Sequence, residues 1–359
     1  MTHFSVNTCR LIIIVLAIVL LSTHAHARSA NKLSPYVQKL LLQAQQVIAA
    51  PNDNDKRTVS LSAEQLEEQS TAAIKKLTKI ELNDYEETLF HKLQASIYLH
   101  KSDYDSALPH FEKAWSMKVL EEPEQRQLQH IIAQLAFSQE QWNKAIIQME
   151  EWISYTTTQA EKPNAVSVSA NDYLILAQSH AKQEQWTAVI SPINMAITLK
   201  SPAPESWYQL ALASHQQLGQ NNESISVLQT ILAIYPNMRY WEQLAATYQK
   251  TEQYNQALTA LRAAYIGGFI KKEKHYIWLT QLAMQQNVPL RGAEVLSTAI
   301  ESGQVKNSTE NLKLLANAWL LAKHYKESAT VIDQLLEQEP NNKKMLKLRS
   351  QLAQHINRT

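Results

Sequence analysis

A small or medium-sized residue recurs along this chain at intervals close to 35 residues, and this spacing constrains the fold more than any other feature. The residues are Ala107, Ala145, Val189, Ser224, Ala257, Ala293 and Ser328, separated by 38, 44, 35, 33, 36 and 35 positions. In most of these segments an aromatic residue stands three positions earlier, after a short polar turn. Two helices approach closely only where a side chain is small. The spacing therefore predicts a repeated pair of helices.

The clearest unit runs from Trp241 to Tyr248 and, after a polar turn, from Tyr254 to Ala264. It follows the pattern W-x2-L-G-x2-Y…A-x3-F, with Ala245 in the place of the glycine. This pattern, with a period near 34 residues, is typical of the tetratricopeptide repeat. The sequence therefore predicts an all-α solenoid, a right-handed superhelix of helix pairs.

The expected organisation has four parts. We predict a signal peptide in residues 1–27, N-terminal helices in 28–82 as a degenerate first repeat, about seven repeats in 83–340, and a capping helix in 341–359. The first two helices are expected near Tyr36–Ala49 and Ala63–Lys79, separated by a polar loop at Pro51–Thr58, and a second loop is expected at Thr156–Asn164. The stripe Met345, Leu348, Leu352 and Ile356 predicts the cap, which a solenoid needs over its last apolar face.

Glycine scarcity supports an all-helical chain. Only five glycines occur in 359 residues, so β-turn-rich folds lack their turn residues, and no glycine pair fits a phosphate-binding loop. We interpret these glycines as marking helix ends. With 45% hydrophobic residues, the chain can bury a large core.

The first 27 residues have the form of a secretory leader. Arg10 precedes an unbroken apolar run at 11–21, and Ala25-His26-Ala27 gives a small-x-small cleavage pattern. A run of eleven is short for a bilayer span, so we expect cleavage after Ala27, export to the periplasm, and no membrane span afterwards. An uncleaved anchor is the alternative. The single cysteine, Cys9, lies within the leader, so the mature chain has no thiol.

The charge balance argues against nucleic acid as a partner. Beyond residue 27 the chain has 33 basic and 33 acidic residues, whereas phosphate binding needs clustered Lys and Arg. The balance also gives no support for a polybasic membrane surface, and we interpret the Lys271–Lys274 run as a solvated helix start.

No pattern in the chain indicates catalytic chemistry. The histidines form no close ligand pair and no carboxylate clusters with them in the sequence. His180 and His215 stand where the repeat usually has tyrosine, so we interpret them as packing residues. We expect no catalytic, cofactor-binding or metal-binding residues, no cofactor and no enzyme activity.

A protein or peptide partner is the remaining prediction. In a helix-pair array, the first helix of each repeat lines a groove, and its residues between packing positions reach a ligand. The candidate groove residues are Gln134, Gln178, Tyr208, Glu242, Lys313 and Asn317. Lys313 and Asn317 are similar to half of the clamp with which some tetratricopeptide domains hold a peptide carboxylate, but we favour ordinary surface polarity as their explanation.

A longer stretch carries a family resemblance. The segments 235–244 (YPNMRYWEQL) and 264–270 (AYIGGFI), followed by Trp278, Pro289 and Trp319, resemble periplasmic tetratricopeptide proteins that accompany TonB energy-transduction systems. The resemblance implies a non-catalytic helper of TonB-dependent outer-membrane uptake of ferric siderophores or haem, with TonB-system components as partners. The alternatives are a periplasmic adaptor for envelope assembly, cell-wall synthesis or polysaccharide secretion, and, less favoured, an enzyme whose site is built across repeats.

Overall fold

The computed structural model describes residues 33–48, 62–161 and 165–356. These residues form seventeen α-helices, and none of them lies in a β-strand. Contacts divide the chain into two units, one ending at Ala203 and the other beginning at Pro204. This division was not predicted from the sequence, which placed the start of another repeat at Ser201–Pro204.

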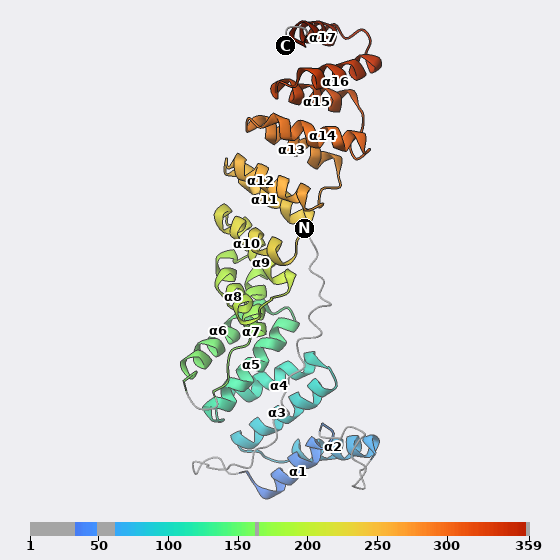
Figure 1. Cartoon of the computed structure of the whole chain (residues 1–359). Helices are drawn as coiled ribbons and strands as arrows, with labels where there is room; N and C mark the ends of the chain where they lie inside the picture. The colour runs from blue at the N-terminus through green and yellow to red at the C-terminus, as the bar shows by residue number, and fades with distance from the viewer. Residues whose placement is uncertain (1–32, 49–61, 162–164, 357–359) are drawn as a thin grey trace. The chain divides into compact units, whose positions relative to one another are not determined.

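The first unit contains eight helices (Figure 1). They are α1 (Pro35–Gln45), α2 (Ala63–Leu77), α3 (Asp84–His100), α4 (Tyr104–Ser116), α5 (Glu122–Ser138), α6 (Trp142–Thr158), α7 (Ala170–Lys182) and α8 (Trp186–Leu199). The second unit contains α9 (Glu205–Gln217), α10 (Asn221–Ile234), α11 (Met238–Lys250), α12 (Tyr254–Ile266), α13 (Glu273–Gln285), α14 (Pro289–Glu301), α15 (Thr309–Leu321), α16 (Tyr325–Gln338) and α17 (Lys343–Ile356).

Successive helices pack as pairs: α3 with α4, α5 with α6, and so on to α15 with α16. The recurrent small residues lie on the second helix of each pair. All seven are buried, with exposed fractions of 0 or 1%. An alanine on the facing first helix is buried in the same way, for example Ala245 opposite Ala257. The spacing of the small residues therefore corresponds to the spacing of the places where two helices cross at close range. The chain is an all-α solenoid of tetratricopeptide-type helix pairs.

The turn inside each of these seven pairs has one conformation. The residue after the C-cap has positive φ, between 56° and 68°, and the next backbone N–H bonds back to a carbonyl five residues earlier, as Gln253 does to Tyr248. This is the Schellman ending of a helix, which usually takes glycine. Only Gly219 fills it here; the other positions are Ser102, Glu140, Glu184, Glu252, Asn287 and Lys323. Six of these seven helix endings therefore form without glycine.

Gly292 has a different role from the helix-end role expected for it. It lies within α14, where a Cβ would come 3.0 Å from Ala283 Cβ and 3.1 Å from Thr280 Cα. The hydroxyl of Thr280 donates a hydrogen bond to the Gly292 carbonyl at 3.1 Å. The glycine therefore permits the close approach of α13 and α14.

The N-terminal helices pack against each other and onto α3. Their core includes Leu40, Leu41, Leu77 and Phe90. The expected loop at Pro51–Thr58 lies outside the described residues, as does the signal peptide. The connection expected at Thr156–Asn164 lies further along the chain than predicted, because α6 continues to Thr158, Thr156 is buried, and α7 begins only at Ala170.

The last helix, α17, lies against α16 and buries Leu352. Its position agrees with the stripe from Met345 to Ile356 that predicted a cap. Within the described ranges, each helix is either too short or too polar to span a lipid bilayer.

Candidate functional site

The third residue of the first helix in each pair is the main polar feature of the structure. These residues are Glu86, Glu124, Asp172, Trp207, Tyr240, His275 and Asn311, and all except Glu124 are buried. A contact with a residue on or just before the preceding first helix is made by each of Glu86, Glu124, Asp172, Tyr240, His275 and Asn311. We call these six contacts the inter-repeat polar ladder.

In the first unit, three contacts build the ladder. The Glu86 carboxylate accepts a hydrogen bond from the Ser34 backbone N–H at 2.9 Å, which joins α3 to the start of α1. Glu124 lies 4.0 Å from the Lys92 ammonium on α3. His130 Nε2 on α5 lies 2.7 Å from Asp172 Oδ1 on α7.

Three more contacts build the ladder in the second unit. The Tyr240 hydroxyl donates to Glu205 on α9. His275 Nε2 lies 3.3 Å from Glu242 Oε2 on α11, and the Asn311 amide donates to Glu273 on α13 at 2.7 Å. Buried polar groups are costly unless paired, so the ladder fixes the register of neighbouring first helices.

Burial and hydrogen bonding compete in setting the pKa values of this ladder. Burial raises the pKa of Asp172, but the hydrogen bonds from His130 and Ser169 outweigh it, and the pKa lies below its ordinary value. The same balance, with donors at Ser34 and Asn83, lowers the pKa of Glu86. Burial lowers the pKa of His275, against the opposing effect of Glu242. At neutral pH the Asp172 and Glu86 carboxylates are therefore charged.

Asp172 is part of a larger cluster. It caps its own helix by accepting from the Ser169 backbone N–H at 2.9 Å. The His130 ring stacks on Trp152, with centroids 3.8 Å apart and planes at 9°. Gln134 lies 3.1 Å from His130 Nε2. The stacking on Trp152 and the contacts of Nε2 orient the His130 ring toward Asp172.

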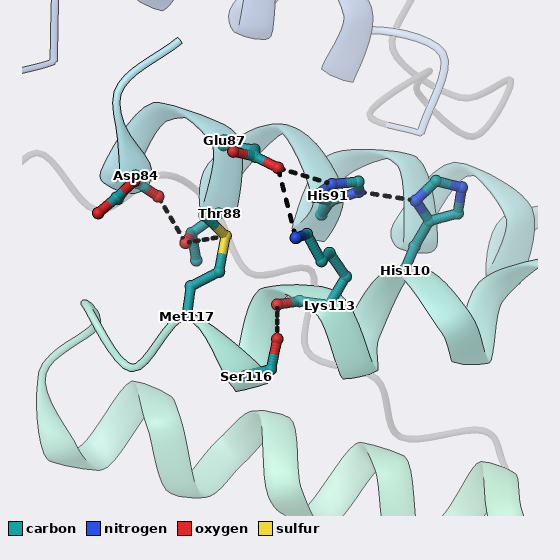
Figure 2. Close-up of polar contacts among 8 residues, drawn as sticks. All are labelled: Asp84, Glu87, Thr88, His91, His110, Lys113, Ser116 and Met117. Carbon is teal, nitrogen blue, oxygen red and sulfur yellow. Dashed lines mark hydrogen bonds and ion pairs between the residues drawn. The ribbon is translucent and has the colours of Figure 1, made fainter.

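A second histidine cluster joins α3 and α4 (Figure 2). His91 Nδ1 and His110 Nδ1 are 2.9 Å apart, and Tyr98 stacks on the His110 ring at 5.5 Å. Glu87 lies 3.6 Å from His91 Nε2 and 3.8 Å from the Lys113 ammonium. Burial lowers the pKa of both histidines, so one neutral ring donates to the other.

The structure brings together a histidine pair and a histidine–carboxylate pair that are distant in the sequence. His91 and His110 are 19 residues apart, and His130 and Asp172 are 42 apart, so no short spacing indicates either contact. His180 and His215 are buried, and each ring Nδ1 lies 2.7 Å from the side chain of a glutamine five residues later. Among the described residues, no group of three or more His, Cys, Asp or Glu is arranged to hold a metal ion.

The candidate groove residues lie on five different first helices, with Lys313 and Asn317 together on α15. Their polar contacts are with residues outside the set. Gln134 and Gln178, on α5 and α7, are half-buried; Tyr208 on α9 is buried and packs against Tyr235, so it offers little surface. Glu242 binds Lys274 and His275 within the ladder. Lys313 forms a 3.1 Å ion pair with Glu339, and Asn317 is exposed.

The polar ladder itself was missed by sequence analysis. Its signal is a polar or aromatic residue at the third position of each first helix, often after a capping residue such as Asn83, Ser169, Asn237 or Ser308. The residue types differ between repeats, which hides the pattern.

No protein-family model and no curated protein sequence matches the chain. Among solved structures, a tetratricopeptide repeat protein from Parabacteroides merdae is 12% identical over 75% of this chain and 99% of its own, with a TM-score of 0.35. The TPR2AB domain of yeast Sti1 in its pHSP90 complex is 11% identical, covering 74% and 98%, with a TM-score of 0.39. The Naa15/Naa10 complex bound to HypK-THB is 13% identical, covering 74% and 39%, with a TM-score of 0.47.

Proposed function

We propose that this protein is a non-catalytic scaffold that binds other proteins on the first helices of its helix pairs. The observation that supports this most is the polar ladder, which holds consecutive first helices in register within each unit. Side chains next to the ladder, such as Asn317 and Lys313, remain exposed on the same helices. A row of helices with fixed spacing and solvent-facing polar side chains is suited to an extended protein segment.

The proposed location is the periplasm, and the support for it is the leader-like sequence of residues 1–27. Mass spectrometry of the protein purified from its own cells tests this. A mature chain beginning at Arg28 is the expected result. An intact N-terminus on a membrane-bound chain would favour the uncleaved anchor instead.

The proposed partners are components of a TonB system, and the proposed process is TonB-dependent uptake of ferric siderophores or haem. The support is the resemblance of residues 235–319, through segments such as 264–270. A deletion strain should grow poorly when ferric siderophore or haem is its only iron source and normally on ferrous iron. Normal growth on every ferric source would reject the TonB assignment while leaving the scaffold proposal intact.

A photo-crosslinking experiment tests the binding face directly. A photoreactive amino acid replaces Asn317 on the first helix α15 or, as the control, Lys326 on the second helix α16; both residues are exposed. We expect a specific crosslinked protein from position 317 only. Equal crosslinking from both positions, or none from 317, would contradict binding on the first helices.

A further inference from the structure

The connection from α12 to α13 presents the most exposed large apolar side chain among the described residues. Ile266, the last residue of α12, has an exposed fraction of 77%. Phe269, three residues later, is half-buried and packs 6.5 Å from the Trp241 ring. Contact with a partner surface would remove the exposed apolar area of Ile266 from water, which is favourable.

The local backbone makes this arrangement rigid. A Cβ on Gly267 would lie 2.7 Å from Phe269 Cε2, so the ring can lie over this position only because the residue is glycine. Gly268 has φ of +71° and completes the turn, and the Phe269 N–H donates to the Ala264 carbonyl at 2.9 Å. The apolar pair is therefore held in place by the turn that ends α12.

Three cations lie close to these two apolar residues in the sequence. Arg262 lies four residues before Ile266 and so on the same face of α12, and Lys271 and Lys272 follow Phe269 directly. All three are exposed, and none forms an ion pair within the part of the chain that the structure describes. In contrast, Lys274 is bound to Glu242. Residues 204–359 as a whole contain 16 basic and 12 acidic residues.

We propose that this α12–α13 tip, formed by Arg262, Ile266, Phe269, Lys271 and Lys272, binds an anionic phospholipid surface. Ile266 enters the boundary between headgroups and acyl chains, and the three cations contact lipid phosphates. A projecting side chain needs no preformed pocket in a fluid bilayer, whereas a protein partner would have to provide one. Each Lys or Arg near an anionic surface strengthens binding about fivefold. One apolar side chain with three cations therefore gives weak, reversible attachment.

This surface departs from the sequence analysis, which interpreted Lys271–Lys274 as a solvated helix start and found no support for membrane binding in the overall charge. The overall charge is uninformative here because the cations of the second unit are offset by acidic residues before residue 204. The tip consists of the end of α12 and the residues before α13, whereas the test of the scaffold face uses Asn317 on α15, so the two proposals can fail independently.

The experiment places an environment-sensitive fluorophore at the tip. Ile266→Cys in a Cys9→Ser background is labelled, and Ile147→Cys, an exposed isoleucine on α6 with an exposed fraction of 53%, is the matched control. The full chain is used. The apolar run at 11–21 can itself bind vesicles, so the readout is the emission of the local probe and not total binding. Vesicles contain phosphatidylcholine alone or with phosphatidylglycerol, and inorganic phosphate alone is a further arm.

We expect a blue shift at position 266 only with phosphatidylglycerol, none at 147, and reversal by high salt. Lys271→Glu with Lys272→Glu should weaken the probe's partition at least tenfold while circular dichroism shows the same helix content. No shift at 266 would overturn the proposal, and would point to a protein as the covering partner. An equal shift with phosphatidylcholine, or with phosphate alone, would also overturn it.

Discussion

His130 Nε2 lies 2.7 Å from Asp172 Oδ1, although the two residues are 42 positions apart and belong to different helix pairs. Asp172 is only 3% exposed, and the stacked Trp152 ring holds His130 in place. The contact joins the first helices of two consecutive pairs, α5 and α7. It therefore links the stability of one repeat to that of the next.

Replacing Asp172 tests this link. Asp172→Ala leaves His130 and the Ser169 N–H without their acceptor, and removing one partner of a buried charged hydrogen bond costs about 1.5–3 kcal/mol. We expect a lower urea midpoint for the unfolding of the first unit. Glu161→Gln, at an exposed position, is the control and should change the free energy of unfolding by less than about 0.5 kcal/mol. Equal changes in the free energy of unfolding for the two variants would show that Asp172 stabilises the first unit no more than an exposed residue does.

Acid should destabilise the fold in two steps. The pKa values of His91, His110 and His275 are lowered by burial, so the unfolded chain binds protons more readily, and stability falls as the pH drops below the unfolded histidine value of 6.5. The lowered pKa values of Asp172 and Glu86 add a further loss as the pH falls below their unfolded values of 3.8 and 4.5. Urea titrations from pH 7.5 to about pH 2 measure both steps.

The His91–His110 pair can be separated from the other groups in that experiment. The double variant His91→Gln, His110→Gln removes two of the groups that titrate below pH 6.5. We expect a flatter dependence of stability on pH between 7 and 5.5 than in the unsubstituted protein. An unchanged slope would show that the pair does not resist protonation in the folded state.

Two substitutions at residues with positive φ should change the folding stability in opposite directions. Glu252 has φ of +61°, a conformation that disfavours a side chain with a Cβ. Glu252→Gly should stabilise the second unit by about 0.5–1 kcal/mol. Gly219 has φ of +68° and open space around it, so Gly219→Ala should destabilise through backbone strain alone, by about 1 kcal/mol. Thermal unfolding followed by circular dichroism measures the melting temperature of each variant. If both melting temperatures shift in the same direction, backbone strain at positive φ does not explain the effects.

Gly292→Ala tests the contact between α13 and α14. In an open helix, Gly→Ala stabilises by about 0.8–1 kcal/mol. Here the new Cβ meets the Thr280 backbone at 3.1 Å, so the helices must move apart, and overpacking of this kind costs about 1–3 kcal/mol. The expected net result is a lower melting temperature. A higher melting temperature would mean that the two helices separate at little cost.

The helix pairs could be predicted from sequence to a large extent. The small residues from Ala107 to Ser328 all lie at helix crossings, because close packing of two helices requires small side chains wherever the crossing occurs. The capping stripe at Met345–Ile356 was predicted from the same helical periodicity. The end of α6 was misjudged, since Thr156 is polar in sequence yet buried in the structure.

The candidate site could be predicted only in part. Position within a first helix placed Lys313 and Asn317 on an exposed surface, but the same rule chose Tyr208, which is buried. Exposure depends on how deeply the neighbouring helices cover each residue. Residues of similar register in the repeat pattern therefore differ in accessibility.

The sequence by itself determined that this protein is an array of helix pairs with a period near 34 residues, because helix propensity, apolar spacing and the recurrent small residues are local properties. Only the tertiary structure decided which distant side chains meet, within a helix pair or between pairs. His91 with His110, Glu86 with Ser34 and Asn311 with Glu273 come from segments 19 to 52 residues apart. Such contacts depend on the crossing of whole helices, and no local pattern encodes that crossing. The tertiary structure also assigned left-handed turns to residues such as Glu140 and Glu184, where the stability of the packed pair outweighs the strain of one residue.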